Sequence, residues 1–288
     1  MLKKLIKYEW KSTNKVGFLL LAAIGLTTLL GALIFRAPIW QSMSENTRNG
    51  DVGETLLNLV SVLSVFLYII LLVGAVYGIF IYLLVRFYRS MYKSEGYLLH
   101  TLPVTKHQIL ISKILVSTIW VYLVYFAMMC SVIIFFFSML TAVTGVSVSV
   151  ILKSVGDFFS DTEFLFSQLG IVTGFSLNVY WVLMLLSLIL GVPAGLITMF
   201  GAVSLGQLFA KNRVLMAIVC YIGIMIARQL LTAVLQGVNY AGSVLIKNGE
   251  FFRYMNSSLA IRLIMNLLLA AGCYVISYYV TTKRLNME

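Results

Sequence analysis

The chain has 288 residues, of which 61% are apolar and only 11% are charged, and its mean hydropathy is +0.98. Soluble domains are closer to half apolar and a quarter charged, so the composition excludes an ordinary soluble protein and predicts an all-α membrane protein. A transmembrane helix needs about 20 largely apolar residues. The sequence contains six such spans within a single membrane domain, 1–288, and they cover residues 16–35, 55–85, 114–140, 175–207, 214–237 and 258–281.

The formal net charge of +11 could indicate a nucleic-acid partner. The distribution of the charged residues along the chain argues against such a partner. If the N-terminus lies inside, 14 of the 21 Lys and Arg fall in inner segments and six in outer ones, while seven of the ten acidic residues lie outside. We expect a multi-pass protein of the plasma membrane, and the positive-inside rule predicts that both of its termini lie in the cytoplasm. No nucleic acid is expected as a partner.

The first residues, "MLKKLIKYEWKSTNK", have the period of an amphipathic helix. Residues 1–15 are therefore predicted to lie along the inner headgroup layer, in contact with membrane lipids. The carboxylate of Glu9 falls in the middle of the apolar arc. Either it reaches out to the interface, or it meets a cation on a neighbouring element. The residues assigned to this interfacial helix are Lys3, Lys4, Lys7, Glu9 and Trp10.

Two groups of polar residues within the spans are candidates for a translocation path. Asn58, Ser61 and Ser64 recur every third residue in the second span and either wet one face of it or serve helix packing. Arg228 lies inside the fifth span, where a cation usually faces the bundle interior or a wet cavity, although it can also extend to the outer interface. Arg262 and Asn266 in the sixth span are possible neighbours of Arg228.

The segment between the second and third spans, "EGYLLHTLPVTKHQILISK", has unusually strong local signals. Ser94 is a candidate N-cap for a short helix that ends before Pro103. A second helix then begins with the capping box Thr105-x-x-Gln108. Such an element, residues 94–104, is suited to transmitting force, although a capped loop alone has the same signals.

The outer connections have less distinct patterns. Residues 141–172 carry apolar residues at helical spacing and are predicted to form an outer loop that includes a short helix. Residues 238–257 are predicted to be a second outer connection, in which Gly237, Gly242 and Gly249 break any long helix.

Sequence motifs of membrane proteases and of ATPases are missing from the chain. No H-E-x-x-H motif occurs, and no Gly-Lys pair occurs, so the chain has no Walker A loop. Cys130, Cys220 and Cys273 lie in predicted spans, away from the histidines, and are interpreted as packing residues rather than disulfides or metal ligands. We therefore expect no catalytic residue, metal or cofactor in this chain, and any ATP hydrolysis requires another polypeptide.

Two stretches resemble the permease subunits of ABC-2 type exporters, with type V-like architecture. They are "LIKYEWK" (5–11) and "FYRSMYKSEGYLLHTLPVTKHQILISK" (87–113). The resemblance implies six spans, an N-terminal connecting helix, and a cytoplasmic coupling helix that docks on an ATPase subunit. It assigns the coupling role to Glu95, Tyr97, Leu98, His100, Thr101, Leu102 and Pro103.

The resemblance also implies a complex with two ATPase subunits, which bind ATP and Mg²⁺, and a second permease subunit, either a copy of this chain or a related one. The expected function is outward transport of an amphipathic or apolar molecule, such as a peptide, bacteriocin, toxin or antimicrobial. The chain itself is expected to be a transport subunit and not an enzyme. The alternative is a membrane scaffold or sensor that binds a cytoplasmic partner without transport.

Overall fold

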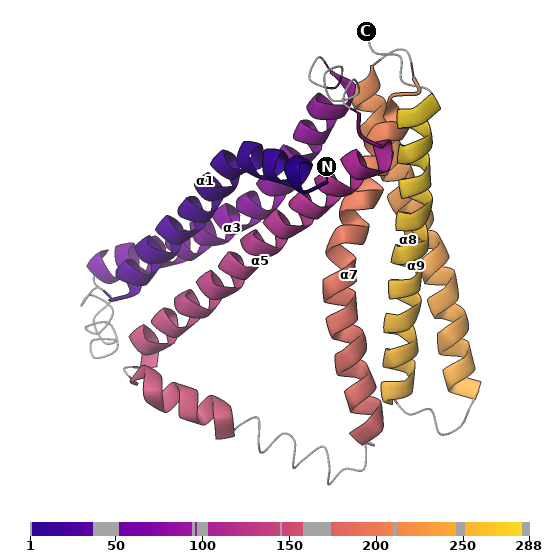
Figure 1. The fold of residues 1–288 in the computed structure, drawn as a ribbon. Helices are drawn as coiled ribbons and strands as arrows, with labels where there is room; N and C mark the ends of the chain where they lie inside the picture. Colours follow the sequence, from indigo (N-terminus) through magenta and orange to yellow (C-terminus); the bar gives the residue numbers. More distant parts are fainter. Residues whose placement is uncertain are drawn as a thin grey trace. The chain divides into compact units, whose positions relative to one another are not determined.

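The structure, a computed structural model, describes residues 2–36, 52–93, 96, 103–144, 146–157, 174–209, 212–245 and 251–283. Within these ranges the chain is helical and has no strand. Its long helices, labelled in Figure 1, are α1 (Leu2–Arg36), α3 (Val52–Tyr92), α5 (Lys106–Thr144), α7 (Gly174–Gly206), α8 (Arg213–Leu245) and α9 (Phe251–Lys283).

Each of these six helices is long and apolar enough to cross a membrane. This finding confirms an all-α, multi-pass membrane protein, and each predicted span falls within one helix or extends beyond it by a single residue. The helices are longer than the predicted spans because hydropathy detects only the apolar part of a helix. Backbone hydrogen bonding continues until a capping or breaking signal is reached. The third helix, for example, begins at Lys106, directly after the predicted cap Thr105.

Two local predictions had different outcomes. Residues 148–157 are helical, which confirms the short helix within 141–172. The prediction for 238–257 was wrong, because Gly237 and Gly242 lie inside α8, which ends at Leu245. Glycine lowers helix stability by only about 1 kcal/mol, so the surrounding helix formers continue through both positions.

The first helix shows no boundary at residue 15. It is continuous from Leu2 to Arg36, since the sequence between residues 11 and 16 contains neither Gly nor Pro. The N-terminal residues and the first span therefore form one helix. The location of residues 1–15 at the headgroup layer stays a prediction.

The chain divides into two compact units. The first unit comprises Met1–Trp10, Tyr82–Ile119 and Glu163–Glu288, and the second comprises Lys11–Ile81 and Trp120–Thr162. Helices α1, α3 and α5 pass from one unit into the other, whereas α7, α8 and α9 belong to the first unit alone.

The core of the second unit combines aromatic packing with hydroxyl hydrogen bonds. Trp120 is fully buried, and its indole occupies the space that a side chain at Gly17 would need. About three turns further along α5, the Ser131 hydroxyl lies 2.6 Å from that of Thr28 and 2.7 Å from that of Tyr68. These contacts join α1, α3 and α5 and satisfy three buried hydroxyl groups.

The first unit depends on close approach of helices at small residues. Gly201 of α7 lies directly against Cys273 of α9, and Gly206 lies against Ala217 of α8. Small residues permit the close packing on which helix association in a bilayer depends, since lipid is as apolar as the helix surfaces.

We predict that Gly201→Ala destabilises the protein and that Gly195→Ala, on the same helix, does not. An added Cβ at Gly201 would lie 2.5 Å from the Cβ of Cys273, whereas nothing lies within 4 Å of one at Gly195. Overpacking costs roughly 1–3 kcal/mol, while the higher helix propensity of Ala contributes about 1 kcal/mol at either position. Thermal unfolding in detergent measures both, and equal midpoints for the two variants would contradict the close α7–α9 contact.

Candidate functional site

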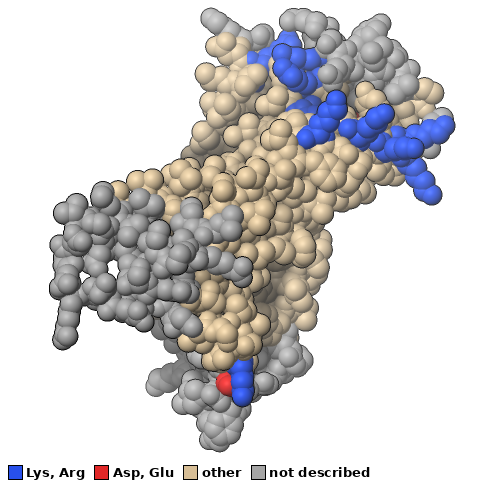
Figure 2. All heavy atoms as spheres, turned by 90° about the vertical axis from the view of Figure 1, so that its left-hand side faces the viewer, with Lys and Arg blue, Asp and Glu red and all other residues tan. Residues whose placement is uncertain are grey.

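Basic side chains gather at one end of the first unit, which we call the basic end. Figure 2 shows Lys and Arg grouped together at the top of the view. The exposed cations of this end include Lys3, Lys4, Lys7, Arg89 and Lys93. Lys3, Lys4 and Lys7 belong to the segment that is predicted to lie at the headgroup layer.

Glu9 lies beneath this surface and is only 5% exposed. Its carboxylate accepts a hydrogen bond from Lys113 Nζ of α5 at 2.5 Å and another from Arg86 of α3 at 2.8 Å. Of the two interpretations of Glu9, the structure therefore confirms the one with a cation on a neighbouring element. The single carboxylate joins three helices.

The cations of this cluster are held by further contacts on α3. Ser90 lies one turn after Arg86 on the same helix face, and its hydroxyl accepts a hydrogen bond from Lys113 Nζ at 2.7 Å. The side chain of Lys113 is 4% exposed and that of Arg86 is 17% exposed. We call Glu9, Arg86, Ser90 and Lys113 the Glu9 cluster.

The Glu9 cluster contains one carboxylate and two cations, so its charges are unequal in number. Removing one partner of a buried ion pair typically costs roughly 3–5 kcal/mol, because the other charge remains buried without compensation. Loss of Glu9 would affect two cations at once. Loss of Lys113 would leave the pair between Glu9 and Arg86.

The ends of α3 and α5 on either side of the predicted coupling segment are attached to other helices. At the end of α3, the Tyr92 hydroxyl donates to Ser204 of α7 at 2.8 Å, and Ser204 lies 3.2 Å from Ser277 of α9. At the start of α5, His107 Nδ1 lies 2.5 Å from the hydroxyl of Tyr274 on α9. Both ends of the segment are thus connected to the α7–α9 pair.

The start of α5 has the N-cap half of the capping box that its sequence predicts. The Gln108 amide donates to the carbonyl of Thr105 at 3.0 Å, and its distance to the Thr105 hydroxyl is 3.4 Å. Pro103, the one residue of the predicted coupling set that is described, is exposed. The six other members, Glu95, Tyr97, Leu98, His100, Thr101 and Leu102, lie outside the described residues.

The predicted translocation residues belong to different units of the chain. Arg228 of α8 donates from Nη1 to Oδ1 of Asn266 on α9 at 3.0 Å, as the sequence suggested. Ser64 is partly exposed on α3 in the second unit, while the side chains of Asn58 and Ser61 lie outside the described residues. A cation at the depth of Arg228 costs about 2.5–3.5 kcal/mol to insert, which makes its amide partner noteworthy.

Arg86 and Lys113 were not recognised from the sequence as the partners of Glu9. The available signal was an acidic residue on an apolar arc together with cations at the ends of two spans. No comparable signal identified Tyr92, Ser204 or Ser277. Among the described residues, no group of three or more His, Cys, Asp or Glu is arranged to hold a metal ion.

Comparisons with models of protein families, with curated proteins and with solved structures find no significant match to this chain.

We predict that Glu9→Gln destabilises the protein more than Lys113→Met does, because the first change leaves two buried cations without an anion. The double variant should be more stable than the sum of the two single changes implies, by roughly 1–3 kcal/mol. Unfolding in mixed micelles measures this double-mutant cycle.

The matched control is Asp157→Asn, which neutralises an exposed carboxylate. Additive effects in the cycle, or a Glu9→Gln variant as stable as Asp157→Asn, would show that the Glu9 cluster contributes little to stability.

Proposed function

We propose that this chain is the membrane-spanning permease subunit of an ATP-driven exporter, similar to the ABC-2 type. The observation that carries the proposal is the attachment of both ends of the 93–105 connection to other helices. On one side, Arg86, Ser90 and Tyr92 of α3 contact α1, α5 and α7. On the other, His107 and Lys113 of α5 contact α9 and α1.

Such attachment has a mechanical consequence. A displacement of the connection is transmitted to α7 and α9 through hydrogen bonds and close packing, because packed interfaces move as discrete units and do not deform continuously. A connection with free ends would absorb the same displacement in its own backbone. The arrangement therefore suits an element that receives force from a cytoplasmic ATPase.

In this proposal, both termini and the basic end lie in the cytoplasm, and the membrane is the plasma membrane. Two ATPase subunits bind ATP and Mg²⁺, and a second permease subunit completes the complex. The 94–104 segment docks on the ATPase, with Tyr97, Leu98 and Leu102 supplying apolar contact and Glu95 favouring the helix N-terminus. The transported molecule is amphipathic or apolar.

The test is purification of the tagged full-length chain from its native membranes, with identification of bound chains and measurement of ATP hydrolysis. We expect a partner that carries a Walker A motif and hydrolyses ATP. The double variant Leu98→Ala, Leu102→Ala should bind it at least tenfold more weakly, since burying each Leu contributes roughly 1.5–3 kcal/mol.

The matched control is Leu26→Ala, Leu30→Ala, which removes two Leu at the same spacing from an exposed face of α1. This control should retain the partner and its activity. A bound partner without ATPase activity would favour the scaffold or sensor alternative. Equal retention by both double variants would contradict docking through 94–104.

A further inference from the structure

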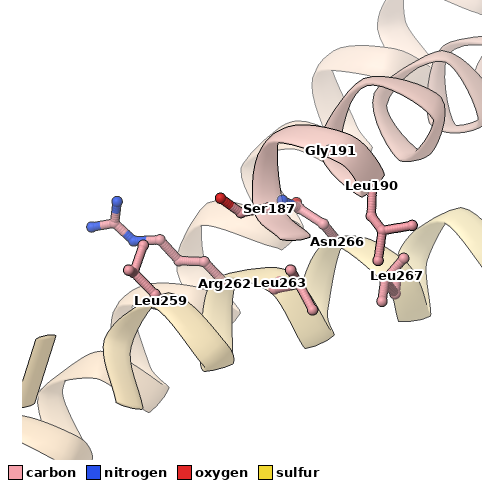
Figure 3. Close-up of a pocket in the computed structure, with 8 residues that line it drawn as sticks. All are labelled: Ser187, Leu190, Gly191, Leu259, Arg262, Leu263, Asn266 and Leu267. Carbon is pink, nitrogen blue, oxygen red and sulfur yellow. The ribbon is translucent and has the colours of Figure 1, made fainter. Parts of the chain in front are cut away.

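A pocket of about 210 Å³ lies between α7 and α9 in the first unit, away from the Glu9 cluster. The space is open beside Gly191, where nothing lies within 4 Å of an added Cβ. Figure 3 shows the lining residues, which are Ser187, Leu190, Gly191, Leu259, Arg262, Leu263, Asn266 and Leu267. Most of the lining is apolar, and its polar groups come from three residues.

The contact with Arg228 determines how the Asn266 amide is oriented. A guanidinium group only donates hydrogen bonds, so the atom that faces Arg228 Nη1 must be the amide oxygen. The amide nitrogen, with its two N–H donors, is therefore not the atom that faces Arg228. Asn266 lines the pocket, and these N–H groups are the donors that its amide offers to other partners.

Arg262 places a positive charge at the edge of the pocket. It lies one turn before Asn266 on the same face of α9, and its exposed side chain extends along the helix past Leu259, away from Asn266 (Figure 3). Neither Arg262 nor Arg228 forms an ion pair within the part of the chain that the structure describes, where both ion pairs belong to Glu9. The hydroxyl of Ser187 donates to the Met184 carbonyl of its own helix and adds no donor.

The pocket thus combines leucine walls and the Asn266 amide with a positive charge at its edge. Pockets for drug-sized molecules have about 300–1,000 Å³, so this one suits a head group and not a whole peptide. The pocket also reaches the apolar surface, since the lining residue Leu267 is exposed. A hydrocarbon chain has a place to lie next to a bound head group.

We propose that this pocket binds the carboxylate or phosphate head group of an amphipathic, lipid-like anion, with its hydrocarbon chain along the neighbouring leucines. Arg262 and the Asn266 amide contact the anion, and Arg228 is a positioning residue that orients the amide. Cationic peptides are disfavoured by the two arginines. If the chain is the proposed permease, this anion is the class of molecule that it transports. Binding at the pocket does not depend on the exporter proposal, and only the step from binding to transport rests on it.

The test is equilibrium binding of radiolabelled oleate to the full-length chain in nanodiscs of zwitterionic phosphatidylcholine. We expect saturable binding, and no competition by oleyl alcohol, which has the same chain without the charge. Arg262→Gln should bind oleate roughly tenfold more weakly, the size expected for one charge-assisted hydrogen bond. Arg228→Leu, which removes the donor that orients the Asn266 amide, should weaken binding by less than Arg262→Gln does. Arg262→Lys should retain more binding than Arg262→Gln.

The matched control is Arg89→Gln, which removes an exposed guanidinium from the end of α3 and should leave binding unchanged. Phosphatidylglycerol added to the nanodiscs separates two sources of the ligand. If it displaces oleate, the natural ligand is the head group of a bilayer lipid. If it does not displace oleate, the natural ligand is a free amphipathic acid.

Unsaturable binding, equal binding by Arg262→Gln and the wild type, or full competition by oleyl alcohol would overturn the proposal. Because the measurement needs no ATPase, such a failure leaves the exporter proposal standing. Conversely, saturable binding without an ATP-hydrolysing partner would refute the exporter and keep the site.

Discussion

The structure depends on the burial of one carboxylate between two cations. Glu9, Arg86 and Lys113 come from three different helices, and each is largely removed from solvent. An unpaired buried charge is costly, so any shift that separates these groups is opposed. The cluster therefore holds the three helix ends in one relative position. Apolar contacts alone would fix this position less tightly, because hydrophobic and dispersion contacts depend little on direction.

One helix links the two polar regions of the first unit. Helix α9 carries Tyr274 and Ser277, which contact α5 and α7 at the basic end, and it also carries Arg262 and Asn266 at the pocket. Asn266 and Tyr274 are eight residues apart, which corresponds to about 12 Å along a helix. If the exporter proposal is correct, α9 connects the ATPase-coupling segment, through the contact of His107 with Tyr274, to the proposed ligand.

The sequence predicts the helices of this protein better than it predicts their partners. Hydropathy locates all six spans because each must exceed the thickness of a bilayer core, and local hydrogen bonding locates the cap at Thr105. Helical periodicity places Glu9 on an apolar arc. Its partners are 77 and 104 residues away, and no local pattern specifies a contact at that separation. The hydroxyl contact of Tyr92 with Ser204 was unpredictable for the same reason.

The most direct test of the account is a distance measurement across the Glu9 cluster in the membrane. Spin labels at Tyr8 of α1 and Ile111 of α5, both exposed residues of the first unit, report the relative position of these helix ends. The labels require a background without Cys130, Cys220 and Cys273. If the shared carboxylate holds the helices together, the distance distribution is narrow with Glu9 present and broad in Glu9→Gln. An equally narrow distribution in both proteins would contradict the account.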